Sequence, residues 1–112
     1  MSVRVERGDR HLVVTLLGEH DIATSHEVRR ALADVRSVPL TVVELAECTF
    51  MDSTVMGVLV SASRRAGEAG TRLVAVNARG IVAKALQITG IADLLQLTKD
   101  PALDDLVNTR DS

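Results

Sequence analysis

The sequence predicts one α/β domain, in which a mostly parallel sheet of about five strands with an antiparallel edge packs against about four helices. Three observations support this fold class. Apolar β-branched runs alternate with segments of helical periodicity, the turn residues Gly8-Asp9 separate the first two runs, and 112 residues suffice for one hydrophobic core but not for two. The expected order of elements is ββαβαβαβα, in a single domain over residues 1–112 whose polar end, 108–112, is expected to fray.

The expected strands are short runs in which β-branched and aliphatic residues dominate. In chain order they are Val3–Glu6, His11–Leu17, Leu40–Leu45, Arg72–Val76 and Leu94–Thr98. Gly18 is expected to end the second strand. The third run is almost wholly apolar, which is typical of a strand that is covered on both faces.

Four segments carry the signals of helices, over about 25–35, 53–69, 81–89 and 101–107. At the start of the first helix, Thr24 and Glu27 have the spacing of a capping box. Asp100-Pro101 supplies a cap and a first-position proline for the last helix. The helices are expected to pack on the sheet through apolar stripes at helical spacing.

The composition argues against several classes of protein. The net charge is −2 and Phe50 is the only aromatic residue, so the chain has neither the basic surface nor the stacking platform of a nucleic-acid binder. The apolar runs are far shorter than the ~20 residues of a membrane span, and no secretory signal opens the chain, so we expect a cytoplasmic protein without a membrane partner. Cys48 is the only cysteine, and no Cys/His spacing is suited to zinc.

Catalysis is not expected either. Ser53 lacks the flanking glycines of a nucleophile elbow, and no histidine falls in such a motif. The glycines resemble helix stops and turns rather than a loop that cradles phosphate. We therefore expect a non-enzymatic protein with no catalytic residue, cofactor or metal ion.

The segment from Cys48 to Gly57 is the most informative part of the chain. A short loop after the third strand leads into Asp52-Ser53-Thr54, where a helical pattern begins. The first N–H groups of a helix are unpaired and its dipole is positive there, so a hydroxyl at this place either caps the helix or carries a phosphate. The residues alone leave both roles open for Ser53, and Asp52 is an equally good cap.

A second polar cluster, Gly18-Glu19-His20-Asp21, is expected in the loop after the second strand. Neighbouring parallel strands deliver their carboxyl ends to the same edge of a sheet, so Glu19 and Asp21 are expected near Asp52 and Ser53. Such a surface is acidic, bears hydroxyls and suits a basic patch on a partner. The alternative is that these loop carboxylates are merely solvated.

Four segments in register resemble those of one known family. Gly18–Asp21 resembles a Gly-Glu-Leu-Asp loop, and Phe50–Thr54 resembles a Phe-Met-Asp-Ser-Ser/Thr phosphorylation motif. Ala69–Leu73 and Leu86–Ile91 resemble two later segments of that family. From about Val3 to Val107, the chain is thus similar to a STAS domain, and most to the bacterial anti-sigma-factor antagonists.

This resemblance implies regulation of transcription by partner switching. The unphosphorylated protein would bind an anti-sigma factor that is also a serine kinase, and so release a sigma factor. Phosphorylation of Ser53, with Thr54 as a second candidate acceptor, would end this binding, and a phosphatase would reset it. The expected partner-binding residues are Glu19, Asp21, Asp52, Thr54, Val55 and Met56.

The chain departs from the family motif at Val55, where the motif has glycine, and at His20, where the motif has leucine. A valine that faces inward only packs the core, whereas a valine that faces the partner alters docking. The second outcome motivates an alternative, a STAS scaffold that assembles with other STAS proteins without being phosphorylated. A third hypothesis, small-ligand binding at the same sheet edge, rests on fold analogy.

Overall fold

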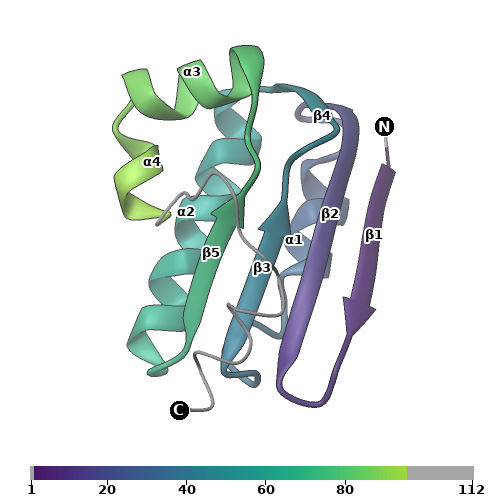
Figure 1. The fold of residues 1–112 in the computed structure, drawn as a ribbon. Helices are drawn as coiled ribbons and strands as arrows, with labels where there is room; N and C mark the ends of the chain where they lie inside the picture. Colours follow the sequence, from purple (N-terminus) through teal and green to yellow (C-terminus); the bar gives the residue numbers. More distant parts are fainter. Residues whose placement is uncertain (1, 96–112) are drawn as a thin grey trace.

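The structure, a computed structural model, describes residues 2–95 (Figure 1). The elements in chain order are β1 Ser2–Arg7, β2 His11–His20, α1 Ser25–Ala31, β3 Leu40–Glu44, β4 Cys48–Met51, α2 Ser53–Glu68, β5 Arg72–Val76, α3 Gly80–Ile88 and α4 Ile91–Leu94. The predicted fold class is confirmed, since these elements form a mostly parallel five-stranded sheet with helices packed on it.

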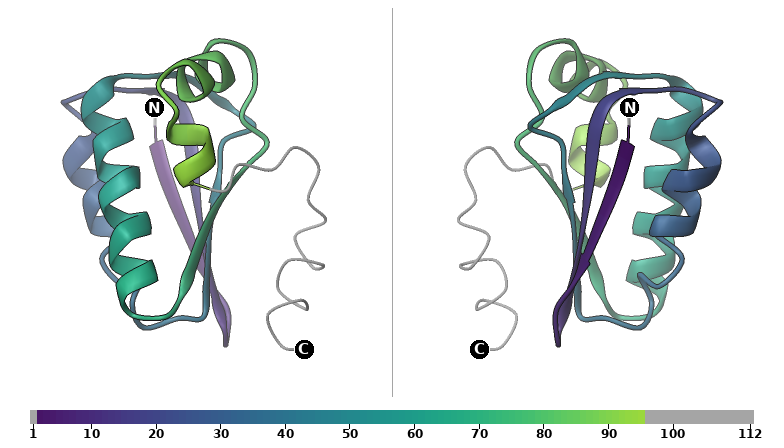
Figure 2. Two further views of the ribbon diagram at one scale, coloured as in Figure 1. Left: turned by 90° about the vertical axis from the view of Figure 1, so that its left-hand side faces the viewer. Right: turned by 90° about the vertical axis from the view of Figure 1, so that its right-hand side faces the viewer.

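The sheet has the strand order β1-β2-β3-β5, with β4 added at the end of β2. β1 and β2 form the antiparallel edge, and they pair in the register Val5↔Val14. The pairs β2–β3, β2–β4 and β3–β5 are parallel. The helices α1 and α2 lie side by side on one face of the sheet, as the two side views in Figure 2 show.

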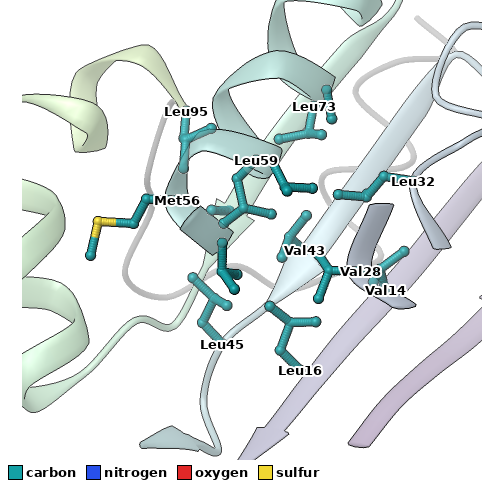
Figure 3. Packing of buried hydrophobic residues seen from close by; sticks show 14 of the residues in the cluster. Val14, Leu16, Val28, Leu32, Val43, Leu45, Met56, Leu59, Leu73 and Leu95 are labelled. Carbon is teal, nitrogen blue, oxygen red and sulfur yellow. The ribbon is translucent and has the colours of Figure 1, made fainter. Parts of the chain in front are cut away.

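The main core lies between this face and the helices. Side chains from α1 and α2, such as Val28 and Leu59, meet Val14, Leu16 and Val43 of the sheet, and all five are fully buried (Figure 3). A smaller cluster of buried side chains lies on the other face, formed by Val13, Leu40, Val42, Val74 and Val76. β3 contributes to both clusters, through Leu40 and Val42 on one face and Val43 on the other, which explains why apolar residues of β3 point to both faces.

The fifth strand is not where the sequence places it. The sequence predicts a strand over Leu94–Thr98, but Leu94 is the last residue of the short helix α4, so the prediction is wrong for Leu94. Residues 96–98 lie outside the described residues. The fifth strand is β4, which lies in the segment expected to be a loop. Four residues are too few to show a strand periodicity, and β4 forms because β2 continues past Gly18 and offers it a partner.

Gly18 does not end β2. It adopts a φ of 81°, and the register with β4 shifts between Gly18 and Glu19, so the strand continues through a bulge to His20. A glycine permits the positive φ of a bulge as well as that of a turn, so Gly18 in the sequence does not distinguish the two. The fourth helix expected over 101–107 and the tail 108–112 lie outside the described residues.

Candidate functional site

Asp52 is the N-cap residue of α2. Asp52 has extended backbone angles, and its Oδ1 accepts a hydrogen bond of 3.0 Å from the backbone N–H of Val55. Ser53 is the first helical residue and its side chain is exposed. Among residues 2–95, no group forms a hydrogen bond with the Ser53 hydroxyl. The cap and the exposed hydroxyl are therefore two different residues, and Ser53 is not needed to start the helix.

Asp52→Ala is expected to lower the free energy of unfolding by about 1 kcal/mol, because it removes the side-chain cap of α2. Chemical denaturation followed by circular dichroism measures this loss. Ser53→Ala serves as the control and should leave stability within about 0.5 kcal/mol of the wild type. A loss of equal size in both variants would show that Ser53 shares the capping role.

The ends of β2 and β4 bring the two polar clusters together. The backbone N–H of Asp52 donates to the carbonyl of His20 at 3.1 Å, and Glu19 pairs in register with Phe50. Asp21 therefore follows β2 at the sheet end where α2 begins, as the sequence predicts. The correction is that Glu19 and His20 belong to β2, not to a loop.

His20 is fully buried and tightly held. Its Nε2 lies 3.2 Å from the carbonyl oxygen of Leu17, and its Nδ1 lies 3.0 Å from the hydroxyl of Thr24. A carbonyl only accepts, so Nε2 donates to Leu17. The Thr24 hydroxyl has one proton, which is within reach of both Nδ1 of His20 and the carbonyl of Asp21. The capping box predicted at Thr24 is wrong, because no side-chain cap bond forms there and the hydroxyl contacts His20 and the backbone of Asp21 instead.

Thr24→Val is expected to lower the free energy of unfolding by about 1–2 kcal/mol, because it keeps the side-chain shape but leaves a buried ring nitrogen of His20 without its partner. Thermal or urea denaturation measures this change. In the background of His20→Leu, the same substitution should cost much less, since the ring nitrogen is then absent. An equal cost in both backgrounds would contradict a role for the bond to His20.

Val55 points into the core and has no exposed surface, and Met56 is only 6% exposed. Val55 belongs to the apolar stripe of α2, which continues with Leu59, Ala62 and Ala66. The valine that replaces the glycine of the motif therefore fills the interior instead of facing a partner. Of the expected partner-binding side chains, Val55 and Met56 are thus covered, whereas the remaining four have exposed surface.

Those four side chains lie at one end of the sheet, around Ser53. They are Glu19, Asp21, Asp52 and Thr54. Glu19 is exposed and the other three are half-buried. Asp21 and Asp52 are both engaged in local bonds, since Asp21 accepts from the N–H of Ala23 at 2.9 Å and Asp52 caps α2. The exposed hydroxyl of Ser53 therefore follows directly on a carboxylate, that of Asp52, which the backbone of α2 holds in place.

A surface groove of about 560 Å³, which the sequence reasoning missed, runs from Ser53 between α1 and α2. We call it the α1–α2 groove. Its lining residues are Arg29 and Ala33 on the α1 side and Ser53, Thr54, Gly57, Val58, Ser61 and Arg65 on α2. The i, i+4 spacing of four of them along α2 was visible in the sequence, but only the packing of α1 beside α2 makes a groove of it.

Other kinds of site have little support in residues 2–95. Within this range no three His, Cys, Asp or Glu side chains lie close enough to hold a metal ion. No helix in the same range is long and apolar enough to cross a membrane. Burial raises the pKa of the Cys48 thiol, which keeps it protonated and unreactive near neutral pH.

Comparison with known proteins identifies the class of protein to which this fold and site belong. The STAS domain family model matches residues 2–105, so the chain belongs to the STAS domain family. Over 94 residues it is 29% identical to the anti-sigma-B factor antagonist of Listeria monocytogenes, and the match covers 82% of each chain.

Solved structures show the same fold. SpoIIAA, an anti-sigma factor antagonist, in its unphosphorylated form gives a TM-score of 0.84 at 18% identity, with 99% of this chain and 98% of that chain covered. The phosphorylated form of SpoIIAA from Bacillus gives 0.76 at 18% identity, with 96% and 99% covered. An anti-sigma factor antagonist from Mycobacterium paratuberculosis gives 0.78 at 25% identity, with 99% and 94% covered.

Proposed function

We propose that this protein is an anti-sigma-factor antagonist whose binding is switched by phosphorylation of Ser53. In the unphosphorylated state it binds an anti-sigma factor that is also a serine kinase, which releases a sigma factor in the cytoplasm. The observation that carries this proposal is the exposed Ser53 hydroxyl, which sits at the first position of α2 while Asp52 supplies the cap. The chain acts by binding and is a substrate of the kinase, which brings its own ATP.

The position of Ser53 suits a phosphate that changes docking without unfolding the domain. A phosphate adds about −1.5 to −2 charges near pH 7, and the positive end of a helix dipole stabilises negative charge. No core side chain has to move, because Ser53 points away from the buried stripe that begins at Val55. The added charge follows directly on Asp52, so the surface becomes more negative at the start of α2. A phosphatase would restore the binding-competent state.

The direct test is incubation with the cognate anti-sigma kinase and ATP, followed by mass spectrometry of the peptide that contains Ser53 and Thr54. We expect one phosphate, on Ser53. Ser53→Ala should abolish it, and Thr54→Ala should leave it in place. A phosphate found only on another residue would contradict the assignment of the acceptor.

The scaffold alternative rested on a valine that faces the partner. Val55 is fully buried and therefore does not face a partner. The valine in place of the motif glycine is thus no reason to expect that Ser53 escapes phosphorylation. No other observation in residues 2–95 favours a scaffold or a small-ligand site. Partner switching is therefore the single function that we propose.

A further inference from the structure

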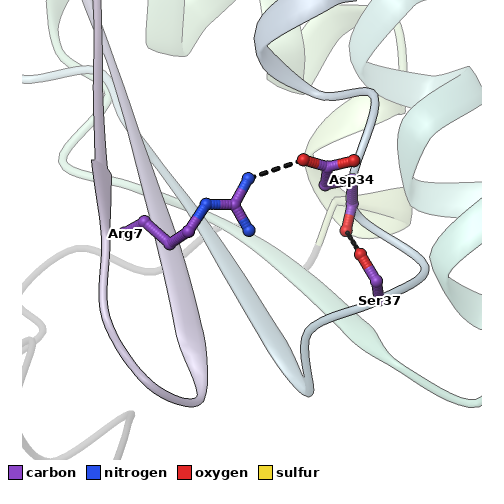
Figure 4. Close-up of polar contacts among 3 residues, drawn as sticks. All are labelled: Arg7, Asp34 and Ser37. Carbon is purple, nitrogen blue, oxygen red and sulfur yellow. Dashed lines mark hydrogen bonds and ion pairs between the residues drawn. The ribbon is translucent and has the colours of Figure 1, made fainter.

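The α1–α2 groove has a positive lining. Arg29 from α1 and Arg65 from α2 both line it, and no carboxylate does. Neither arginine forms an ion pair with any of residues 2–95. Asp34, which follows Ala33 of the groove, is instead paired with Arg7 of β1 at 2.5 Å, as Figure 4 shows. Within the described residues the two groove arginines thus have no ion-pair partner, which suits them to an acidic group of a binding partner.

The floor of the groove is open because of Gly57. Gly57 lies in α2, is exposed, and a Cβ added to it would meet nothing within 4 Å. Glycine is a poor helix former, and no contact inside the described part of the chain requires it there. Its effect is to leave room between the two helices for the side chains of another molecule.

We propose that the α1–α2 groove binds an acidic segment of the anti-sigma factor, with carboxylates of that segment paired to Arg29 and Arg65. This inference rests on the proposed function and names the chemistry that the partner presents. Arg65 lies twelve positions after Ser53 along α2, a length of about 18 Å. A partner segment of about twelve residues fills that length as a helix, and one of five or six fills it as an extended strand.

The same groove connects docking to phosphorylation. Ser53 and Thr54 line one end of it, so a phosphate on Ser53 enters the space that the acidic segment occupies. The phosphate repels the carboxylates of the segment and competes with them for the arginines. Phosphorylation then releases the partner without any change in the fold.

The test uses charge reversals with matched controls on the same helices. Arg29→Glu is compared with Arg30→Glu, and Arg65→Glu with Arg64→Glu, because each control changes the net charge equally but lies outside the groove. The probe is the anti-sigma factor that binds the wild-type protein, and affinity is measured by calorimetry at about 150 mM salt. We expect each groove variant to weaken binding at least about tenfold and each control to change it less than about twofold.

A steric test accompanies the charge test. Gly57→Leu fills the groove and is expected to weaken binding at least about tenfold. Gly67→Leu makes the same change in α2 outside the groove, where a Cβ also meets nothing within 4 Å, and should bind normally. Circular dichroism checks that all variants are folded.

The outcomes separate the two proposals. Equal weakening by groove variants and controls, or no weakening by either, would overturn the groove assignment while wild-type binding still supports the antagonist function. If the wild-type protein binds no anti-sigma factor, the antagonist function fails and the groove proposal fails with it. The association rate should also fall as salt is raised from about 50 to 300 mM, and this dependence should be weaker in Arg29→Glu.

Discussion

Ser53→Asp is expected to weaken binding to the anti-sigma factor by about 2 kcal/mol, or about thirtyfold, whereas Ser53→Ala should bind within about threefold of the wild type. The physical reason is local. Aspartate places a negative charge on the exposed first residue of α2, beside Asp52 and at the mouth of the α1–α2 groove. Calorimetry or surface plasmon resonance with the purified anti-sigma factor measures both affinities.

A stability measurement is the necessary control for this pair of variants. Both should unfold within about 0.5 kcal/mol of the wild type, because Ser53 is exposed and Asp52 keeps the cap. Equal affinities of Ser53→Asp and Ser53→Ala would remove the switch, whatever the site of phosphorylation. Weaker binding together with a large loss of stability would point to unfolding rather than to docking.

Val55→Gly is expected to lower the free energy of unfolding by about 3 kcal/mol, since it empties a fully buried position and places a poor helix former in the first turn of α2. For a domain of this size, the melting temperature should fall by roughly 10–15 °C. Val55→Ala should lose less, because it keeps the helix propensity and removes only the two methyl groups. Differential scanning calorimetry measures all three proteins.

The same variant restores the glycine of the family motif, so it separates packing from recognition. Below its melting temperature, Val55→Gly should be phosphorylated on Ser53 at a rate close to that of the wild type. Unchanged stability would mean that Val55 does not pack in the core. A phosphorylation rate that rises several-fold would mean that the valine hinders the kinase.

The long, strongly patterned elements were predicted well from the sequence. β3 and β5 are mostly apolar runs, and α2 carries the apolar stripe that begins at Val55. In these elements the residues with an apolar pattern are the ones that the structure buries. β4 could not be found in this way, because its four residues have no strand pattern of their own and depend on β2 for their hydrogen bonds. The prediction of a capping box at Thr24 was wrong for a related reason. The Thr24 hydroxyl contacts the ring of buried His20, four residues earlier, and forms no cap bond with the start of α1.

The site was predicted in part. The proximity of Asp21 and Asp52 followed from the rule that neighbouring parallel strands end at one edge, and the hydrogen bond from Asp52 to His20 bears it out. The i, i+4 stripe from Val55 to Leu59 agrees with an inward valine, but the sequence left open whether Val55 faces the core or a partner. The α1–α2 groove could not be anticipated, because its arginines come from two helices whose relative placement the sequence does not state.

By itself, the sequence determined that a hydroxyl would stand at the start of a helix, and that an acidic segment would end a neighbouring strand. These are local consequences of periodicity, capping chemistry and parallel strands. Only the tertiary structure decided that Asp52, not Ser53, caps α2, that Val55 is buried, and that Ser53 opens onto a groove with Arg29. The reason is that capping geometry, burial and a shared groove each depend on how separate elements pack, and no single segment of the chain contains that information.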